Sequence, residues 1–466
     1  MNPAGPPISV RDIETPASDP VVRAATGVIG GPLGRYSRVT SALPWQPAAV
    51  ALTLIGTLML AAGTLQKGYC TANGWAVPDV FWRACYSDLP FLFSGSALQQ
   101  GDFPYAAEGS LSQPVLTGLT MWVTSLLVPG DGDPVVRQRW YFGIWVLLIL
   151  VLLALLIRVV ARCARRNPWR AAHVAASPLI LTVALVSADL LGVLLATYGL
   201  WCWSRRRPAL AGVAFGLAIS ARTYPILILL VIGLLALRSG RTREWLEATG
   251  VALLTWVALL AAVGLPTAGA PFSTYQTWWN AGPDYGSLWY LPTVMDVYVS
   301  PAAATGLAVA GWLLAVAAGG VLALGARRRP TIAEVSIVVV GLVLVTGKAL
   351  PVQSSLWLLP LIALAGFRWR DHLIWAGAEA AYFVAIWLYL GGLSDPNRGL
   401  PLPWLAFFSL LRIAGICWLV AVAWRSASRR PALAEETQGE PDADHDPDDV
   451  AGPLAGRRDQ VTLSFA

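Results

Sequence analysis

The stretch Trp140–Ala161, WYFGIWVLLILVLLALLIRVVA, decides the fold class, because it is long and apolar enough to cross a membrane as a helix. About 20 apolar residues in an α-helix span the roughly 30 Å of hydrocarbon in a bilayer. Such runs recur along a chain of 466 residues that is 56% hydrophobic, only 13% charged and has a mean hydropathy of +0.59. We therefore expect an all-α polytopic membrane protein. A β-barrel would need alternating segments of about ten residues, which the sequence lacks.

About twelve apolar segments are expected to be transmembrane or partly spanning helices. They are residues 47–66, 140–161, 172–186, 188–204, 208–221, 225–238, 246–265, 301–325, 331–347, 351–367, 372–391 and 403–424. Some, such as residues 208–221, are too short to span comfortably, and short helices are tolerated where they line a cavity.

The polar ends of the chain are expected to be disordered cytoplasmic tails, over residues 1–45 and 426–466. Between them, residues 46–425 form the expected transmembrane domain. Within it, residues 67–138 are expected to form a large first extracytoplasmic loop, and residues 266–300 a second, aromatic one.

Clusters of arginine between the apolar runs predict the orientation. All fall on one side if every segment crosses, and that side is predicted to be cytoplasmic, together with both termini. The clusters are Arg162, Arg165, Arg166 and Arg170; Arg205, Arg206 and Arg207; Arg238, Arg241 and Arg243; Arg327, Arg328 and Arg329; Arg368 and Arg370; and Arg425, Arg429 and Arg430.

Cys70 and Cys85 both lie in the first predicted outer loop, 15 residues apart. An exported loop permits oxidation, so a disulfide between them is a candidate, with two free thiols as the alternative.

The first outer loop also contains a candidate catalytic carboxylate, Asp88, in YSDLPFLFSGSALQQGDFPY. A partly desolvated carboxylate can act as a general base for a hydroxyl nucleophile. The alternative is a structural role at a helix start, since Ser87 and Asp88 precede a helical-looking run. Asp79 and Asp102 are competing carboxylates in the same loop.

Two isolated cations, Arg222 in SARTYPILIL and Lys348 in TGKALPVQSSLWLLPLIAL, fall on the predicted outer side, against the positive-inside trend. An ionisable group at membrane depth is a functional hypothesis, and a guanidinium suits a phosphate. The alternative for Arg222 is that its side chain reaches the lipid headgroups.

Polar and aromatic residues nearby are candidates for binding a sugar. Gln353 and Trp357 are four residues apart and are expected to share a helix face. Asp284 and Tyr285 lie in the aromatic stretch STYQTWWNAGPDYGSLWYLP, for which an interfacial aromatic belt is the alternative. Asp189 lies at the turn between two apolar runs and could close a helix pair or reach a cavity.

No nucleotide-binding loop and no cluster of histidines or paired cysteines is found, so neither a cofactor nor a metal is predicted. The net charge of +6 comes from the arginine clusters, so it does not argue for nucleic acid as a partner.

Three of these motifs together resemble the integral-membrane glycosyltransferases of the C superfamily (GT-C), and most closely glycosyltransferase family 87. Members of that family tend to show an Asp, then a Tyr a few residues on, then Gly-x-x-Pro-Tyr. Asp88 and GDFPY match this pattern, while Phe91 or Phe93 stands where Tyr is common. RTYP corresponds to the family's K-x-Y-P, with Arg222 in place of Lys. LPVQSSLWLLP corresponds to its SPQYxLWLLP, with Ser354 where Tyr is common.

The resemblance implies a GT-C-like fold over most of residues 47–424, with Asp88 as the catalytic residue. It implies a cation near the lipid-linked phosphate, carried onto Arg222 and Lys348. The candidates for sugar or acceptor binding are Tyr86, Asp102, Tyr105, Asp189, Tyr224, Asp284, Tyr285, Gln353 and Trp357.

The resulting hypothesis is an inverting transferase at the outer face of the plasma membrane, with Asp88 as general base. It would move a hexosyl group, with mannose the expected sugar, from a polyprenyl-phosphate donor to a glycan or glycolipid of the cell envelope. Its partners would be the lipid bilayer, the polyprenyl-phosphate sugar and the acceptor. A lipid or solute transporter, such as a flippase, is the alternative, and a scaffold without catalysis is a third.

Overall fold

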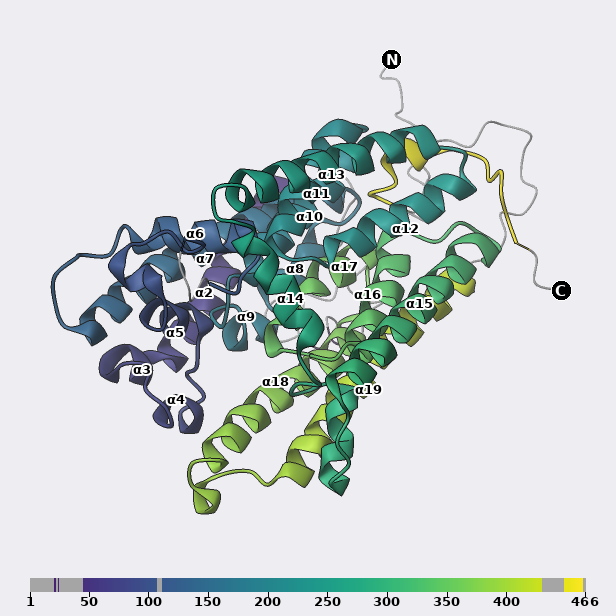
Figure 1. The fold of residues 1–466 in the computed structure, drawn as a ribbon. Coiled ribbons are helices and arrows are strands. Elements are labelled where there is room, and N and C mark those ends of the chain that lie inside the picture. Colours follow the sequence, from purple (N-terminus) through teal and green to yellow (C-terminus); the bar gives the residue numbers. More distant parts are fainter. Residues whose placement is uncertain (1–20, 22–23, 25–44, 107–110, 430–447, 464–466) are drawn as a thin grey trace.

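The computed structural model describes residues 21, 24, 45–106, 111–429 and 448–463, and all regular structure in this part of the chain is helical. Long helices pack side by side across the molecule (Figure 1). Six of the described helices are long and apolar enough to cross a membrane. They are α2 (Trp45–Gln66), α7 (Pro134–Cys163), α13 (Thr242–Gly264), α15 (Pro301–Gly325), α18 (Trp369–Gly392) and α19 (Leu402–Ser428). The prediction of an all-α polytopic membrane protein is confirmed.

Shorter apolar helices fill the space between the long ones. They are α10 (Asp189–Ser204), α11 (Pro208–Ala221), α12 (Pro225–Arg238) and α16 (Ile332–Thr346). The 14 residues of α11 extend about 21 Å at 1.5 Å per residue, less than the hydrocarbon thickness. Nearly every side chain of α16 is buried, so this helix lies in the core.

Each of the two remaining predicted segments is divided into two short helices. The second helix of each pair has a proline at its first or second position. One consists of α8 (Ala172–Ala175) and α9 (Pro178–Thr182), and the other of the 3₁₀-helix η8 (Val352–Trp357) and α17 (Leu359–Ala365). Proline lacks the amide hydrogen that a continuing helix would use, so it is accommodated in a first turn.

The segment between α2 and α7 folds into short helices at one end of the bundle. They are α3 (Gly68–Asn73), α4 (Asp79–Trp82), α5 (Asp88–Ser94), η4 (Ala97–Gln100) and α6 (Val115–Ser125). Helices α3 to α5 lie together at the lower left of Figure 1. Cys70 and Cys85 form a disulfide there, which agrees with the proposed pairing. We call this end of the bundle the Asp88 end.

A second irregular segment, between α13 and α15, contributes to the same region. It contains η6 (Ala270–Phe272), the aromatic helix α14 (Ser273–Asn280) and η7 (Leu288–Met295). The connection from α18 to α19 contains η9 (Pro396–Arg398).

The opposite end of the bundle carries the arginine clusters and the C-terminal residues, and we call it the Arg-rich end. Residues 448–463, with η11 (Gly452–Leu454), pack against it (upper part of Figure 1). Trp203 Nε1 donates to Ala451 O at 3.1 Å, and Arg238 pairs with Asp459 at 2.8 Å.

The C-terminal part of the chain differs from the prediction of a disordered tail over residues 426–466. Helix α19 continues to Ser428, and residues 448–463 form the packed segment described above. The physical reason is the burial of Val450 and Leu454, which an acidic composition conceals. Nearly all of the other predicted tail, residues 1–45, and residues 430–447 lie outside the described part of the chain.

Candidate active site

Asp88 is the first residue of α5, and hydrogen bonds to the backbone fix its position. Ser87 caps the helix by accepting from Leu89 N, and its hydroxyl donates to Leu185 O at 2.7 Å. Asp88 N donates to Val186 O at 2.7 Å. The start of α5 is therefore attached to the turn that precedes α10, which begins at Asp189. The capping role considered as the alternative belongs to Ser87, which leaves the Asp88 carboxylate available for another role.

The surroundings of the Asp88 carboxylate keep its proton affinity high. Burial raises its pKa to about 6, against smaller opposing effects of a hydrogen bond from Tyr86 and the charges of Arg222 and Lys67. The neighbouring Asp189 adds to the rise. A carboxylate with a pKa near 6 is mostly ionised at neutral pH and still a competent proton acceptor.

Lys67 lies beside this site and was not singled out from the sequence. Its side chain is fully buried, and Nζ donates to Tyr86 O at 2.8 Å. Burial lowers the pKa of Lys67 to about 7, despite the stabilising charge of Asp88. A lysine directly after an apolar helix is typical of an interfacial anchor, so the sequence carried no signal for this placement.

Arg222 and Asp189 form a buried ion pair close to Asp88. Arg222 Nε and Nη2 lie 2.8 and 2.7 Å from Asp189 Oδ1, with side-chain exposures of 15% for Arg222 and 1% for Asp189. Asp189 also accepts from Ser187 Oγ and from Trp357 Nε1, both at 2.7 Å. Arg222 Nη1 donates to Gln113 Oε1 at 3.2 Å. The side chain therefore points into the protein and does not extend to the membrane surface.

The 3₁₀-helix η8 brings two further predicted residues to the same place. Gln353 Nε2 lies 3.5 Å from Asp88 Oδ2, and Trp357 binds Asp189 as described. Residues four apart do not stack in a 3₁₀-helix, which has three residues per turn. The two side chains instead reach neighbouring carboxylates. Trp357 also stacks on Tyr224, with ring centroids 4.6 Å apart and planes inclined by 9°.

A buried ion pair between α18 and α19 holds η8 in position. Arg412 Nε donates to Glu379 Oε2 at 2.7 Å, and both side chains are almost fully buried. The guanidinium also donates to Leu350 O and, at 2.9 Å, to Pro351 O, directly before η8. Nothing in the sequence connects these two residues, 33 positions apart, with the site.

An apolar cavity of about 510 Å³ lies next to Arg222. Its wall includes Tyr224, Trp278, Trp312 and Trp357. A second apolar cavity of about 570 Å³ shares Ile226 with the first and extends between α11, α12, α13 and α15.

Lys348 lines the first cavity, but its ammonium group is engaged by the protein. Nζ donates to Trp279 O and Ala281 O, both at 2.9 Å, and to Thr305 Oγ1 at 2.8 Å. A lysine has three N–H donors, so none remains in this arrangement. The contacts fasten the end of α14 to α15, and burial lowers the pKa of Lys348.

The other predicted residues divide into buried and exposed groups. Tyr105 is buried, and its hydroxyl donates to Gln113 O at 2.9 Å. Asp102 and Asp284 are exposed, and in the described part of the chain no hydrogen bond or ion pair joins them to Asp88, Asp189 or Arg222. The structure therefore brings together Asp88, Asp189, Arg222, Gln353 and Trp357 from four separate segments.

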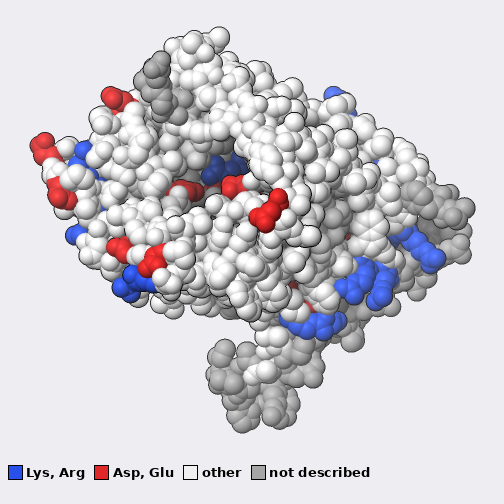
Figure 2. All heavy atoms as spheres, turned by 60° about the horizontal axis from the view of Figure 1, so that its bottom comes forward, with Lys and Arg blue, Asp and Glu red and all other residues white. Residues whose placement is uncertain are grey.

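Aromatic side chains cluster in the outer segments, and one of them, Tyr86, hydrogen-bonds the Asp88 carboxylate. Tyr86 packs on Trp387 with centroids 4.8 Å apart, and Trp387 stacks on Phe81. Tyr285 contacts Tyr290 and Tyr389 edge to face. Figure 2 looks onto the Asp88 end and shows a hollow that contains acidic and basic side chains among uncharged atoms. Among the described residues, no three His, Cys, Asp or Glu side chains form a group that could hold a metal ion.

Residues 134–350 match the model of glycosyltransferase family 87. The chain resembles this glycosyltransferase family. The matched region contains Asp189, Arg222 and Lys348, while Asp88 and Gln353 lie outside it. The resemblance to family 87 predicted from the sequence is thereby confirmed, and the match supports a membrane glycosyltransferase.

Among solved structures, the chain is similar to the crystal structure of ArnT from Cupriavidus metallidurans bound to undecaprenyl phosphate. The identity is 18%, the TM-score is 0.38, and 72% of each chain is covered. No curated protein matches the chain significantly.

Proposed function

We propose that this family 87-like protein transfers a hexosyl group from a polyprenyl-phosphate donor to a hydroxyl of a glycan or glycolipid, with Asp88 as general base. The observation that carries the proposal is that the Asp88 carboxylate lies close to the Arg222–Asp189 ion pair, and that Arg222 in turn lines an apolar cavity. This arrangement offers one site for a hydroxyl proton, one for a phosphate and one for a lipid.

The two apolar cavities suit the isoprenoid part of the donor. They share Ile226. The first is lined mainly by apolar and aromatic side chains from α12, α14, α15, α16 and η8, with Arg222 and Lys348 as its charged residues, and the second by apolar and aromatic side chains from α11, α12, α13 and α15. Burial of each methylene group is worth about 0.8 kcal/mol, so a long hydrocarbon chain would be held firmly. The phosphate at its end would then lie near the Arg222 guanidinium. Four of the five N–H groups of Arg222 already donate to Asp189, Gln113 and Ala221 O, so the remaining one on Nη2 can donate to a phosphate oxygen, and a second bond requires exchange with one of these partners.

Asp88 accepts the proton of the acceptor hydroxyl as its oxygen attacks the anomeric carbon of the donor sugar. The bond from that carbon to the phosphate oxygen breaks on the opposite face, so the configuration inverts. The bonding pair leaves with the polyprenyl phosphate, whose growing negative charge is stabilised by Arg222. The proton then on Asp88 passes to solvent, which returns the carboxylate to its ionised form.

The orientation follows from charge. The Arg-rich end lies in the cytoplasm by the positive-inside rule, so the Asp88 end faces outward. The disulfide between Cys70 and Cys85 fits an oxidising compartment on that side. We place the protein in the plasma membrane, with both termini cytoplasmic and with mannose on the donor as the first sugar to test. Tyr86 and Tyr285 are proposed to contact the sugars.

The test uses purified protein in lipid nanodiscs, supplied with radiolabelled polyprenyl-phosphate mannose and a lipid extract of the host cells as acceptor. We expect a labelled product from this donor and none from a nucleotide-linked mannose. Arg222→Ala should raise KM for the donor strongly. Arg83→Ala, which removes an exposed arginine in the same outer region, should not.

Two results would count against the proposal. Transfer from the nucleotide sugar alone would refute the lipid-linked donor. Movement of the labelled lipid across the membrane without any new glycosidic product would favour the flippase instead.

A further inference from the structure

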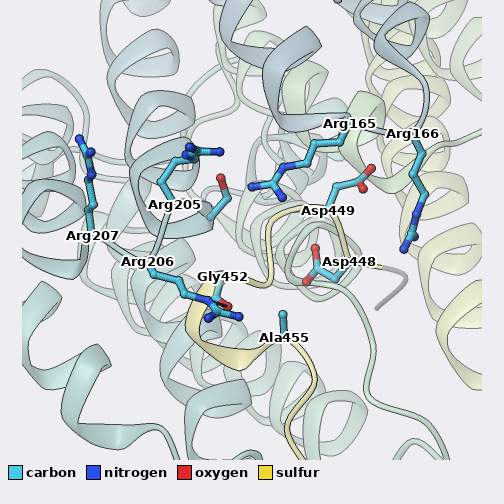
Figure 3. A pocket seen from close by; sticks show the side chains of 10 residues that line it. Arg165, Arg166, Arg205, Arg206, Arg207, Asp448, Asp449, Gly452 and Ala455 are labelled. Atoms are coloured by element: carbon cyan, nitrogen blue, oxygen red, sulfur yellow. Dashed lines mark hydrogen bonds between the residues drawn. The ribbon is translucent and has the colours of Figure 1, made fainter. Parts of the chain in front are cut away.

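A pocket at the Arg-rich end gathers arginines from two loops that are distant in the sequence. Arg165 and Arg166 follow α7, and Arg205, Arg206 and Arg207 follow α10. The cavity measures about 380 Å³ and is closed on one side by the C-terminal segment, through Asp448, Asp449, Gly452 and Ala455 (Figure 3). Helix α10 leads from the Asp189 site to this pocket, about 24 Å for its 16 residues.

The C-terminal segment is held closely enough to make a defined wall. Arg206 Nε donates to Gly452 O at 3.4 Å, and Figure 3 shows Arg206 extending toward this wall. Gly452 has φ +58° and passes so near Trp203 O that a Cβ would clash with it. Only glycine fits this approach, so the wall has a specific position in the fold.

The two carboxylates of the pocket already have partners elsewhere. Asp448 Oδ2 accepts from Ile332 N at 2.8 Å, at the start of α16, and Oδ1 accepts from Val450 N at 3.0 Å. Asp449 pairs with Arg170 at 3.8 Å. Five arginines against two aspartates leave the pocket lining with a net charge of +3.

Three of the arginines carry charge that the described protein does not neutralise. Arg165, Arg205 and Arg207 are exposed and form no ion pair with any residue that the structure describes. The positive-inside rule accounts for arginines on this side of the membrane, but it does not require loops 40 residues apart to converge on one walled cavity. Like charges held together at such a cavity favour an anionic ligand.

We infer that this pocket binds a phosphate-bearing anion at the membrane surface, separately from the proposed donor site. Guanidinium groups donate paired hydrogen bonds to phosphate oxygens, and several of them can enclose one phosphate. Two sources share this chemistry: the headgroup of an anionic phospholipid in the adjacent leaflet, and a free phosphate in solution. Basic pockets between membrane helices on the cytoplasmic side are suited to headgroups.

The test measures the thermal unfolding midpoint of the full chain with two probes. One arm compares nanodiscs of phosphatidylcholine with nanodiscs that also contain phosphatidylglycerol. The other adds inorganic phosphate against chloride at equal ionic strength. The variant Arg165→Gln/Arg205→Gln/Arg207→Gln removes the unneutralised charges. The matched control, Arg243→Gln/Arg327→Gln/Arg429→Gln, removes three exposed arginines outside the pocket.

We expect at least one probe to raise the midpoint of the wild type and of the control, and not that of the pocket variant. A response to phosphatidylglycerol alone assigns the ligand to the leaflet, and a response to phosphate assigns it to solution. If the triple variant fails to fold, Arg207→Gln alone should weaken binding of the active probe roughly tenfold. Equal responses of pocket variant and control, or no response of the wild type, would overturn the inference.

Discussion

Replacing Asp88 by Asn tests the proposed chemistry most directly. Asn keeps the shape of the side chain and can still accept from Gln353 Nε2, but it cannot take a proton. With a pKa of about 6, Asp88 is ionised in about nine of ten molecules at pH 7, so nearly all of the enzyme would lose its base. General-base catalysis contributes about 10²–10⁴-fold, so we expect kcat to fall about a thousandfold, or about 4 kcal/mol in barrier height.

The same substitution should not destabilise the fold, which separates catalysis from structure. A carboxyl whose pKa is raised in the folded state stabilises the fold below its unfolded pKa and loses that contribution as pH rises through about 6. At pH 7 the ionised Asp88 therefore carries a cost of about 3 kcal/mol, since each pKa unit corresponds to 1.36 kcal/mol. Asp88→Asn removes that cost, so its melting temperature should equal or exceed that of the wild type.

The assay is transfer from polyprenyl-phosphate mannose in nanodiscs at pH 7, with melting temperature measured on the same preparations. Asp102→Asn, an exposed carboxylate of the same outer region, is the matched control and should retain full activity. Turnover by Asp88→Asn within tenfold of the wild type would refute its role as the base. Lost activity combined with a clearly lower melting temperature would assign Asp88 a structural role instead.

Three further outcomes are expected. First, kcat/KM should fall tenfold per pH unit below about pH 6, as Asp88 becomes protonated. Lys67→Met should move the midpoint of this pH profile to higher pH, because it removes a positive charge that favours the ionised carboxylate. An unchanged midpoint would contradict the interaction between Lys67 and Asp88. Second, Lys348→Met should lower the melting temperature without raising KM for the donor, because its ammonium holds carbonyl groups; a large rise in KM would restore it as a phosphate ligand. Third, Glu379→Gln should lower the free energy of unfolding by about 3–5 kcal/mol, because it leaves Arg412 as an uncompensated buried charge. Denaturation in detergent measures this loss, and a loss below about 1 kcal/mol would contradict the prediction.

The sequence predicts the helices well because the bilayer sets their length. A segment such as Trp140–Ala161 has no stable place in water and too little polarity for a loop, so its helix is determined locally. All twelve predicted apolar segments are helical in the structure, including the two that are broken. The C-terminal segment is the exception: its few apolar residues, such as Val450 and Leu454, gain their role only from the surface they meet.

The site could be predicted only in part, because residue types are local and their partners are not. The sequence points to Arg222 because an isolated charge between apolar runs needs a reason, and to Asp88 because aromatic residues flank this carboxylate in the first outer loop. The hydrogen bonds of Lys348 could not be predicted, since the carbonyl groups that accept them belong to Trp279 and Ala281 at the end of α14, 69 and 67 residues away. Lys67 was missed for the same reason, as its partner Tyr86 lies 19 residues further on.

The ion pair between Arg222 and Asp189 has a consequence for how this protein folds in the membrane. A guanidinium that brings its own counter-ion can be assembled in the bilayer before any substrate is present, because the bare cation never faces hydrocarbon. In the proposed mechanism, the donor phosphate would exchange one oxyanion for another at Arg222 or share the cation with Asp189. Under that proposal, affinity for the phosphate would reflect a difference between two anions, which would allow the spent lipid carrier to leave.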